Sequence, residues 1–432
     1  MSNSVTTSRR QFLKTSALAG GALLAPAILP AQNSPAQQGP TLKIGLIGCG
    51  GRGTGAASQA LNADHNVVLT SLADVFEDKL NASLEAIRAA APDKVKVDPD
   101  HCFVGLDAYQ KVIDSGVDVV LLATPPGFRP AHLRAAVAAG KHIFCEKPMA
   151  TDAPGVRSVM ESVQQAQEKK LSLVAGFCWR YNLAERALFS RIHDGAIGQV
   201  RVVYGTYYTG SVRPLPPPSQ RPASMGDLEW QLRNWYNFGW LSGDGFVEQA
   251  VHAVDWMCWA MNDAPPEKAV AVGGRQIPAE GGNIFDHFEV NYEFADGARG
   301  FLASRQQNGC ADDNSATIFG TKGDARELGY AAMPFIRGET KWRYAGPRPN
   351  MYQVEHDELF ASIRSGQPIN DGVRMAQSTL AAIMGRMAAY TGQEITWEMA
   401  LNSTENLAPR KIAWDAPAPV APMAMPGQTK FV

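Results

Sequence analysis

The chain has 432 residues, of which 45% are hydrophobic and 19% charged, a composition typical of a globular protein of about two domains and not of a disordered chain or a membrane bundle. Forty basic residues against forty-two acidic ones leave a formal net charge of −2, so no cationic excess is available to neutralise a phosphate backbone, and nucleic acid is not expected as a partner. Six cysteines are scattered without a C-x-x-C pair, and we expect them to be free thiols.

The first residues predict an export signal. The sequence SRRQFLK at residues 8–14 precedes a weakly apolar stretch over about residues 15–29 that is rich in Gly and Ala and too short to favour a membrane-spanning helix. An S-R-R-x-F-L-K pattern is typical of the twin-arginine route, which carries folded proteins through the twin-arginine translocase. We therefore expect a signal peptide over residues 1–32, a polar linker over 33–41, and a periplasmic or otherwise extracytoplasmic location.

The next segment alternates short apolar runs with helical stretches. Five runs, LKIGLIG, NVVLTSLAD, VDVVLLAT, HIFCE and LSLVAGF, are rich in Val, Ile and Leu, and the segments between them, such as PAHLRAAVAAG, have helical periodicity. Continuous apolar strands separated by helices indicate a parallel sheet that is covered on both faces. We expect this first domain over residues 42–170.

A glycine-rich turn follows the first predicted strand. In the G-x-G-x-x-G pattern Gly48 permits the tight turn, Gly50 lets the backbone approach a pyrophosphate, and Gly53 packs the next helix on the sheet. Phosphates would bind free N–H groups at the start of that helix. The motif predicts dinucleotide contacts at Gly48, Gly50, Gly51, Arg52 and Gly53.

An acidic residue stands where a ribose ligand is expected. Asp74 ends the second run, twenty-one residues after Gly53. A carboxylate there accepts hydrogen bonds from ribose hydroxyls and repels a 2′-phosphate, so we expect NAD in preference to NADP. The alternative is that Asp74 only caps a helix.

Two further stretches resemble one family. They are ATPP at 123–126 with CEKP at 145–148, and SGDGFVEQAVHAVD at 242–255. Both resemble the glucose–fructose oxidoreductase and inositol dehydrogenase family, known as Gfo/Idh/MocA, and the likeness runs from about 42 to 397. It implies an N-terminal Rossmann domain followed by an α+β domain with a large, open, mostly antiparallel sheet. It also implies cofactor contacts at Thr124, Pro125, His132, Glu146 and Lys147.

The second half of the chain supports such a sheet independently. The runs VRVVYGTYYTG, FEVNYEFADGARGFLASR and ATIFGTKGDAREL predict strands joined by short turns, and Asp296-Gly297 is typical of a hairpin. HDELFASIRSG and RMAQSTLAAIMGRMAAY predict closing helices. We expect this domain over residues 171–400 and a tail over 401–432.

The resemblance implies that Lys147 and His252 are catalytic. Lys147 would lie at the carboxyl end of a strand, where ligands enter an open α/β sheet, and could donate to the reacting hydroxyl. His252 would take the hydroxyl proton. Glu248, where relatives usually carry Asp, and Asp255 share a helical face with His252, and both are candidate substrate ligands. Asp255 could alternatively fix the tautomer of His252. A surface lysine and a core histidine are the alternatives.

Other roles for these and neighbouring residues stay open. The face of Glu248, His252 and Asp255 could hold a metal completed by Asp286 or His287, but the spacing matches no common zinc signature, and no metal is expected. A Pro-rich segment over 210–232 predicts a loop near the substrate or an arm to a neighbouring subunit. Further substrate candidates, or alternatively core residues, are Trp235, Tyr236 and Trp240. The resemblance also implies substrate contacts at Arg180 and Tyr181.

The sequence thus predicts an exported NAD(P)-dependent oxidoreductase that transfers hydride between a nicotinamide cofactor and a sugar or polyol hydroxyl. Outside the cytoplasm no NAD pool is available for exchange, so the cofactor would be tightly held and recycled. Redox-neutral glycoside cleavage through oxidation and elimination is the alternative, and a non-catalytic binding protein is a third reading. The resemblance also implies a homo-oligomer.

Overall fold

The computed structural model of the protein describes residues 39–277 and 280–432. The signal peptide expected over residues 1–32 and most of the expected linker lie outside the described residues. Within the described ranges no helix is both long and apolar enough to cross a membrane.

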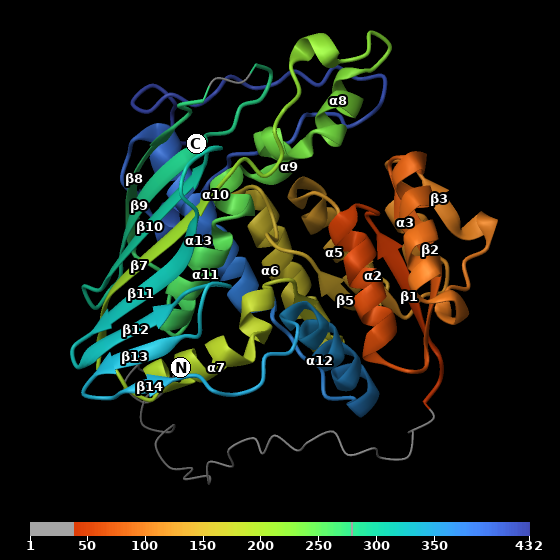
Figure 1. Cartoon of the computed structure of the whole chain (residues 1–432). Coiled ribbons are helices and arrows are strands. Elements are labelled where there is room, and N and C mark those ends of the chain that lie inside the picture. Colours follow the sequence, from red (N-terminus) through yellow and green to blue (C-terminus); the bar gives the residue numbers. More distant parts are fainter. Residues whose placement is uncertain (1–38, 278–279) are drawn as a thin grey trace, which may run out of the picture. The chain divides into compact units, whose positions relative to one another are not determined.

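The first sheet has six parallel strands in the order β3-β2-β1-β4-β5-β6 (Figure 1). The strands are β1 Leu42–Ile47, β2 Val67–Asp74, β3 Cys102–Val104, β4 Val119–Leu122, β5 His142–Cys145 and β6 Leu173–Ala175. All four residues of β4 are buried, as a strand covered on both faces requires. The expected Rossmann sheet is confirmed, and it extends through β6, past the predicted domain boundary at residue 170.

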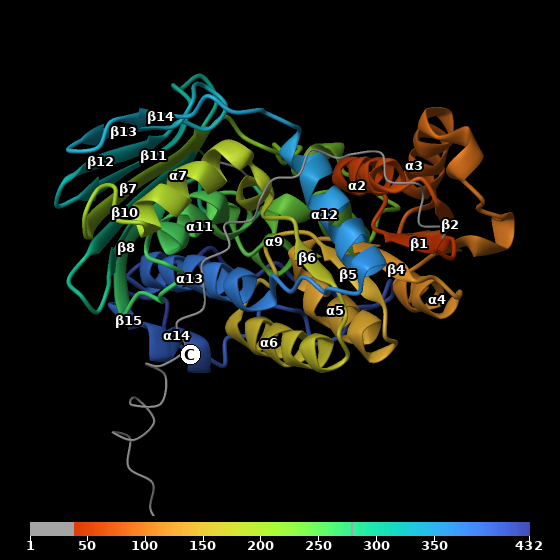
Figure 2. The ribbon, with the colours of Figure 1, turned by 90° about the horizontal axis from the view of Figure 1, so that it is seen from below.

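Helices cover both faces of this sheet. One face carries α4 Ala108–Asp114, α5 Arg129–Ala138 and α6 Ala153–Glu168. The other carries α2 Gly51–Ala63, α3 Glu77–Ala90 and, from far along the chain, α12 Met351–Ser365. Figure 2 shows α12 beside α2. Residues 351–365, expected in the second domain, therefore help to close the first.

The second sheet has nine strands in the order β14-β13-β12-β11-β7-β10-β9-β8-β15. They are β7 Val200–Thr209, β8 Lys268–Gly274, β9 His287–Glu293, β10 Arg299–Gln306, β11 Asp313–Gly320, β12 Gly323–Glu327, β13 Phe335–Gly338, β14 Trp342–Arg343 and β15 Ile395–Thr396. Only the β10–β7 pairing is parallel, so the expected mostly antiparallel sheet is confirmed. Gly297, at φ 81°, forms the predicted turn between β9 and β10.

Helices also cover one face of the large sheet (Figure 1). The long helix α13 Gly372–Thr391 lies on β8 and β9, and α11 Val251–Ala260 lies on β7. Asn350 caps the start of α12, and left-handed glycines at 366 and 392 end α12 and α13, so the two closing helices have the local signals that their boundaries need. The remaining helices are α7 Leu183–His193, α8 Asp227–Arg233, α9 Gly239–Ser242, α10 Gly245–Glu248 and α14 Trp397–Asn402.

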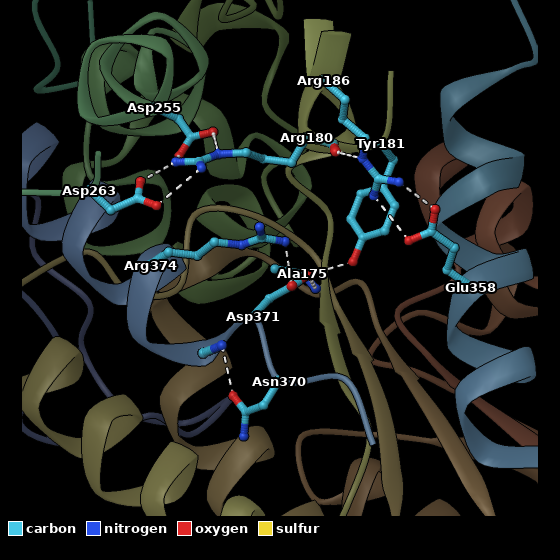
Figure 3. A network of polar contacts seen from close by, with 11 residues as sticks. Ala175, Arg180, Tyr181, Arg186, Asp255, Asp263, Glu358, Asn370, Asp371 and Arg374 are labelled. Carbon is cyan, nitrogen blue, oxygen red and sulfur yellow. Dashed lines mark hydrogen bonds and ion pairs between the residues drawn. The ribbon is translucent and has the colours of Figure 1, made fainter. Parts of the chain in front are cut away.

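A buried polar network ties the first sheet to α13 (Figure 3). The carboxylate of Asp371, just before α13, accepts from the backbone N–H of Ala175 at 3.0 Å and from the hydroxyl of Tyr181 at 2.7 Å. Arg374 also pairs with Asp371. Since Ala175 ends β6, these bonds fix the carboxyl edge of the first sheet against a helix of the second domain.

Candidate active site

The glycine-rich turn leaves open space in front of α2. Gly48 has a φ of +100°, and a Cβ on Gly53 would lie 1.9 Å from the Gly48 carbonyl oxygen, so both positions require glycine. A Cβ on Gly50 or Gly51 would meet no described atom within 4 Å. No described side chain caps α2 at Gly50, so the first N–H groups of the helix remain available. These features fit the phosphates of a dinucleotide.

Asp74 lies beside this turn at the carboxyl end of β2. Its carboxylate accepts from the backbone N–H of Cys49 at 2.7 Å and of Phe76 at 2.9 Å. Burial raises the pKa of Asp74. Each carboxylate oxygen has a second lone pair, so Asp74 keeps acceptor capacity for ribose hydroxyls while it orders the two loops that flank the cofactor position.

The side chain of Arg52 turns away from the glycine turn. Its guanidinium donates to Glu146 at 2.5 Å, to Gln59 at 2.8 Å and to Glu355 at 2.7 Å. The other oxygen of Glu146 accepts from the backbone N–H of Lys147 at 3.2 Å. Arg52 thus connects the turn with the segment that carries Lys147, and the cofactor contact expected at Arg52 stays a prediction.

The loop after β4 holds Thr124 and Pro125, as expected for that motif. The hydroxyl of Thr124 lies 3.2 Å from Nδ1 of His132. Burial, and then the charge of Arg129, lower the pKa of His132 to about 3, so its imidazole is neutral. Arg129, which sequence analysis missed, donates to the carbonyls of Thr124 and Pro148 and so joins this loop to the one after Lys147.

Lys147 follows β5 and meets Glu248 from the second domain. Its Nζ lies 3.0 Å from Oε1 of Glu248 and also donates to the Glu248 carbonyl oxygen. Both side chains are nearly buried, at 10% and 9% exposure. A buried ion pair with two bonds holds the ammonium in one place, at the strand end where a ligand would enter.

His252 stands in the first turn of α11, close to Lys147. Burial, and then the charge of Lys147, lower the pKa of its imidazole well below the usual value, so the ring is neutral. Its Nδ1 is buried and has no hydrogen-bond partner among the described residues. The structure therefore brings Lys147, Glu248 and His252 together.

Two buried tyrosines lie within electrostatic range of Glu248, Tyr207 on the large sheet and Tyr236 in the short helical turn Trp235–Asn237. The hydroxyl of Tyr207 on β7 donates to Gln249 at 2.9 Å, and that of Tyr236 lies 2.9 Å from Gln306 on β10. Burial first, and then the charge of Glu248, raise the pKa of both tyrosines. Tyr236 was predicted from the sequence. Tyr207, Gln249 and Gln306 were not; for Tyr207 and Gln306 the reason is that only the fold brings β7 and β10 to Gln249 and Tyr236.

Other predicted substrate ligands are engaged elsewhere (Figure 3). Arg180 donates to Asp255 at 2.8 and 2.9 Å and to Asp263 at 2.5 Å, beneath the ring of Trp259. The hydroxyl of Tyr181 is bonded to Asp371. The structure does not bring Arg180, Tyr181 or Asp255 to Lys147, and Asp255 does not orient His252; their contacts are those of a structural network.

Two of the predicted aromatic candidates, Trp235 and Trp240, pack in a cluster with residues of the first domain. Trp240 is buried, donates from Nε1 to Gln231 at 2.6 Å and packs edge-on against Phe128 at 5.8 Å. Trp235 is half-buried and stacks under Arg213 at 5.6 Å. Both belong to a hydrophobic cluster that includes residues of the first domain.

The alternative metal site is not assembled. Asp255 pairs with Arg180, and His287 pairs with Asp286 at 2.8 Å. Across residues 39–277 and 280–432, no group of three or more His, Cys, Asp or Glu side chains is arranged to hold a metal ion. The six cysteines, all within these ranges, are free.

Comparison with known proteins matches both halves of the chain to one family. Residues 42–177 match the oxidoreductase family with an NAD-binding Rossmann fold, and residues 186–326 match the GFO/IDH/MocA C-terminal domain. The chain is 26% identical to a myo-inositol 2-dehydrogenase of Thermotoga maritima over 65% of this chain and 74% of that protein. An inositol 2-dehydrogenase of Salmonella paratyphi B is 26% identical over 52% of this chain and only 55% of that protein.

Two further proteins are similar to this chain. A glycosyl hydrolase family 109 protein of Streptomyces coelicolor is 29% identical over 44% of this chain and 43% of that protein. The structure of a levoglucosan dehydrogenase in complex with NADH and levoglucosan superposes with a TM-score of 0.65 at 20% identity, over 82% of this chain and 99% of that one. Since the two family matches together cover well over half of the sequence, the chain belongs to the Gfo/Idh/MocA family of NAD-binding oxidoreductases.

Proposed function

We propose that this protein is an NAD-dependent oxidoreductase that acts on a CH–OH group of a sugar or polyol. The observation that carries the proposal is the cluster of Lys147, Glu248 and His252 at the carboxyl end of β5, beside a glycine turn that fits a dinucleotide. The relatives named as inositol 2-dehydrogenases and the NADH complex of levoglucosan dehydrogenase support it.

The residues of the site divide the chemistry between them. The backbone of the turn from Gly48 to Gly53 would hold the phosphates, and Asp74 would hold the adenosine ribose. A bound nicotinamide supplies the acceptor for the hydride that leaves the substrate carbon. The ammonium of Lys147, fixed by Glu248, donates a hydrogen bond to the substrate oxygen. His252 is neutral and accepts the proton of the hydroxyl, so the alcohol becomes a carbonyl.

We further propose export with the cofactor already bound. The support is the SRRQFLK sequence at residues 8–14, together with the absence of an external NAD pool for exchange. Cell fractionation tests the export: replacing Arg9 and Arg10 by Lys is expected to leave the protein in the cytoplasm. Equal extracytoplasmic amounts of the wild type and this variant would contradict it.

One experiment tests the proposed function directly. Full-length protein is purified and denatured, and the released small molecules are identified by mass spectrometry, with NAD expected over NADP. Native protein is then mixed with a panel of sugars and polyols while absorbance at 340 nm is followed. A substrate-dependent change at 340 nm is expected. Protein that neither retains nor binds a dinucleotide would refute the proposal.

Redox-neutral glycoside cleavage is a second candidate. The likeness to a glycosyl hydrolase family 109 protein favours it, and the same Lys147 and His252 would serve a transient oxidation followed by elimination. A panel of aryl glycosides separates the two candidates. Release of the phenol with no net change in NADH would establish cleavage, whereas NADH accumulation without phenol release would establish the dehydrogenase.

A further inference from the structure

A third hydrophobic cluster lies outside the two sheets. It joins α8 and α9, a stretch of the C-terminal tail that includes Ala418, and residues that directly follow strands of the first sheet. Phe76 follows β2, Leu106 follows β3 and Phe128 follows β4. We call residues 226–242 and 403–418 the cover. In Figure 1 the helix α8 and the blue tail lie together near the top of the picture, whereas α12 lies near the bottom.

The cover is tied to the loop that carries the predicted ribose ligand. Arg233 of α8 places its guanidinium 4.0 Å from the centre of the Phe76 ring and reaches the carboxylate of Asp78 at 3.3 Å. Trp414 of the tail packs on the same Phe76 at 6.2 Å. Since the backbone N–H of Phe76 bonds to Asp74, both parts of the cover hold the segment next to Asp74.

The cover also meets the loop after β4, on the other side of the predicted adenosine position. A Cβ on Gly127 would lie 2.3 Å from the carbonyl oxygen of Trp240, so the two backbones are in direct contact. The ring of Phe128 packs against Trp240. The cover therefore bridges the loops after β2 and β4, and the adenosine end of a dinucleotide lies between such loops in open α/β sheets.

The two parts of the cover are fastened to each other and to the body of the protein. Gln231 of α8 donates to the carbonyl oxygen of Ala418 and accepts from Trp240 at 2.6 Å. Nearer the start of the tail segment, the backbone N–H of Leu407 donates to the carboxylate of Asp152 at 3.1 Å. Fixed at both ends, the tail segment is an ordered part of the molecule.

We propose that residues 226–242 and 403–418 form a cover over the adenosine end of the cofactor site, and that its opening limits the release of NAD. The inference rests on the proposed function, because it requires a bound dinucleotide. A ligand that lies between the loops after β2 and β4 cannot leave past α8 and the tail unless their contacts with Phe76 and Phe128 break. A slow opening step retains the cofactor without stronger contacts to NAD itself.

The test measures release rather than turnover. Full-length protein is loaded with NADH, mixed with excess NAD, and the loss of NADH fluorescence is followed with time. The variant Arg233→Ala/Trp414→Ala removes both contacts to Phe76, and we expect release to become faster by about tenfold or more. Met425→Ala, at an exposed tail residue beyond the cover, is the matched control and is expected to release NADH at the wild-type rate.

Hydrogen exchange on the wild type gives a readout that needs no variant. Amides in residues 226–242 and 403–418 are expected to exchange more slowly when NAD is added, as are those around Phe76. Unchanged release in the double variant, or unchanged exchange in the cover while NAD is bound, would overturn the inference and leave the proposed function intact. Failure of the wild type to bind any dinucleotide would overturn both.

Discussion

Replacing Arg180 by Met tests whether this residue is structural or a substrate ligand. Arg180 is almost fully buried, with 2% of its side chain exposed, and Asp255, its bidentate partner, has 3% exposed. Removing the guanidinium leaves the buried carboxylate of Asp255 without its cationic partner, which costs about 3–5 kcal/mol of folding free energy. The second partner, Asp263, is 33% exposed and regains water, so we assign it no further cost.

Thermal unfolding measures this cost. For a protein of this size, about 3–5 kcal/mol corresponds to a fall in Tm of roughly 4–6 °C. Arg186→Met is the matched control, because Arg186 forms an equally bidentate pair with Glu358 in the same network, but both side chains are about one third exposed. We expect Arg186→Met to cost about 1 kcal/mol.

The two variants separate the two roles of Arg180 clearly. A structural Arg180 predicts a large fall in Tm for Arg180→Met and a small one for Arg186→Met. If Arg180→Met instead unfolds at the wild-type temperature and raises only the KM for the polyol substrate, the structural reasoning is refuted and Arg180 contacts substrate after all.

Three further predictions follow from the site and the core. Gly50→Val is expected to unfold at the wild-type temperature, because a Cβ there meets no described atom within 4 Å, but to lose NAD binding in a fluorescence titration. Gly53→Ala is expected to fold poorly, so equal Tm values for the two variants would contradict this reasoning. Burial raises the pKa of Glu327 to about 8, so the folded state holds a proton that the unfolded state releases above about pH 4.5. Wild-type stability should therefore fall relative to Glu327→Gln between pH 5 and pH 8, and parallel urea-unfolding curves across that range would refute the assignment. His252 is held neutral, so the acidic limb of kcat/KM should lie below pH 6.5, and His252→Asn should remove that limb and lower kcat by about 100-fold or more; a limb that survives this substitution would exclude His252 as the base.

Local signals predicted the parts of the structure that local geometry decides. The turn from Gly48 to Gly53 and the carboxylate of Asp74 follow from backbone requirements within one strand–turn–helix unit. The hairpin at Gly297 is equally local. The strand Cys102–Val104 was missed because it has only three residues, and none of them is fully buried.

Long-range partners decided the rest. Helical spacing suggested that Glu248 and Asp255 share a face with His252, but α10 ends at Glu248 and α11 begins at Val251, and Asp255 pairs with Arg180. The distant partners of Arg52 and the position of α12 on the first sheet likewise depend on how remote segments meet. A single sequence carries no signal for such pairings.

The central claim is that the amine of Lys147 acts on a substrate hydroxyl beside the nicotinamide. The most direct test is single-turnover absorbance at 340 nm on NAD-loaded protein with the best polyol of the panel, comparing Lys147→Met with Lys96→Met, a change at an exposed lysine. With both variants saturated with NAD, we predict a rate lowered by about 100-fold or more in Lys147→Met alone. A Lys147→Met protein that reduces NAD at the wild-type rate would contradict the account.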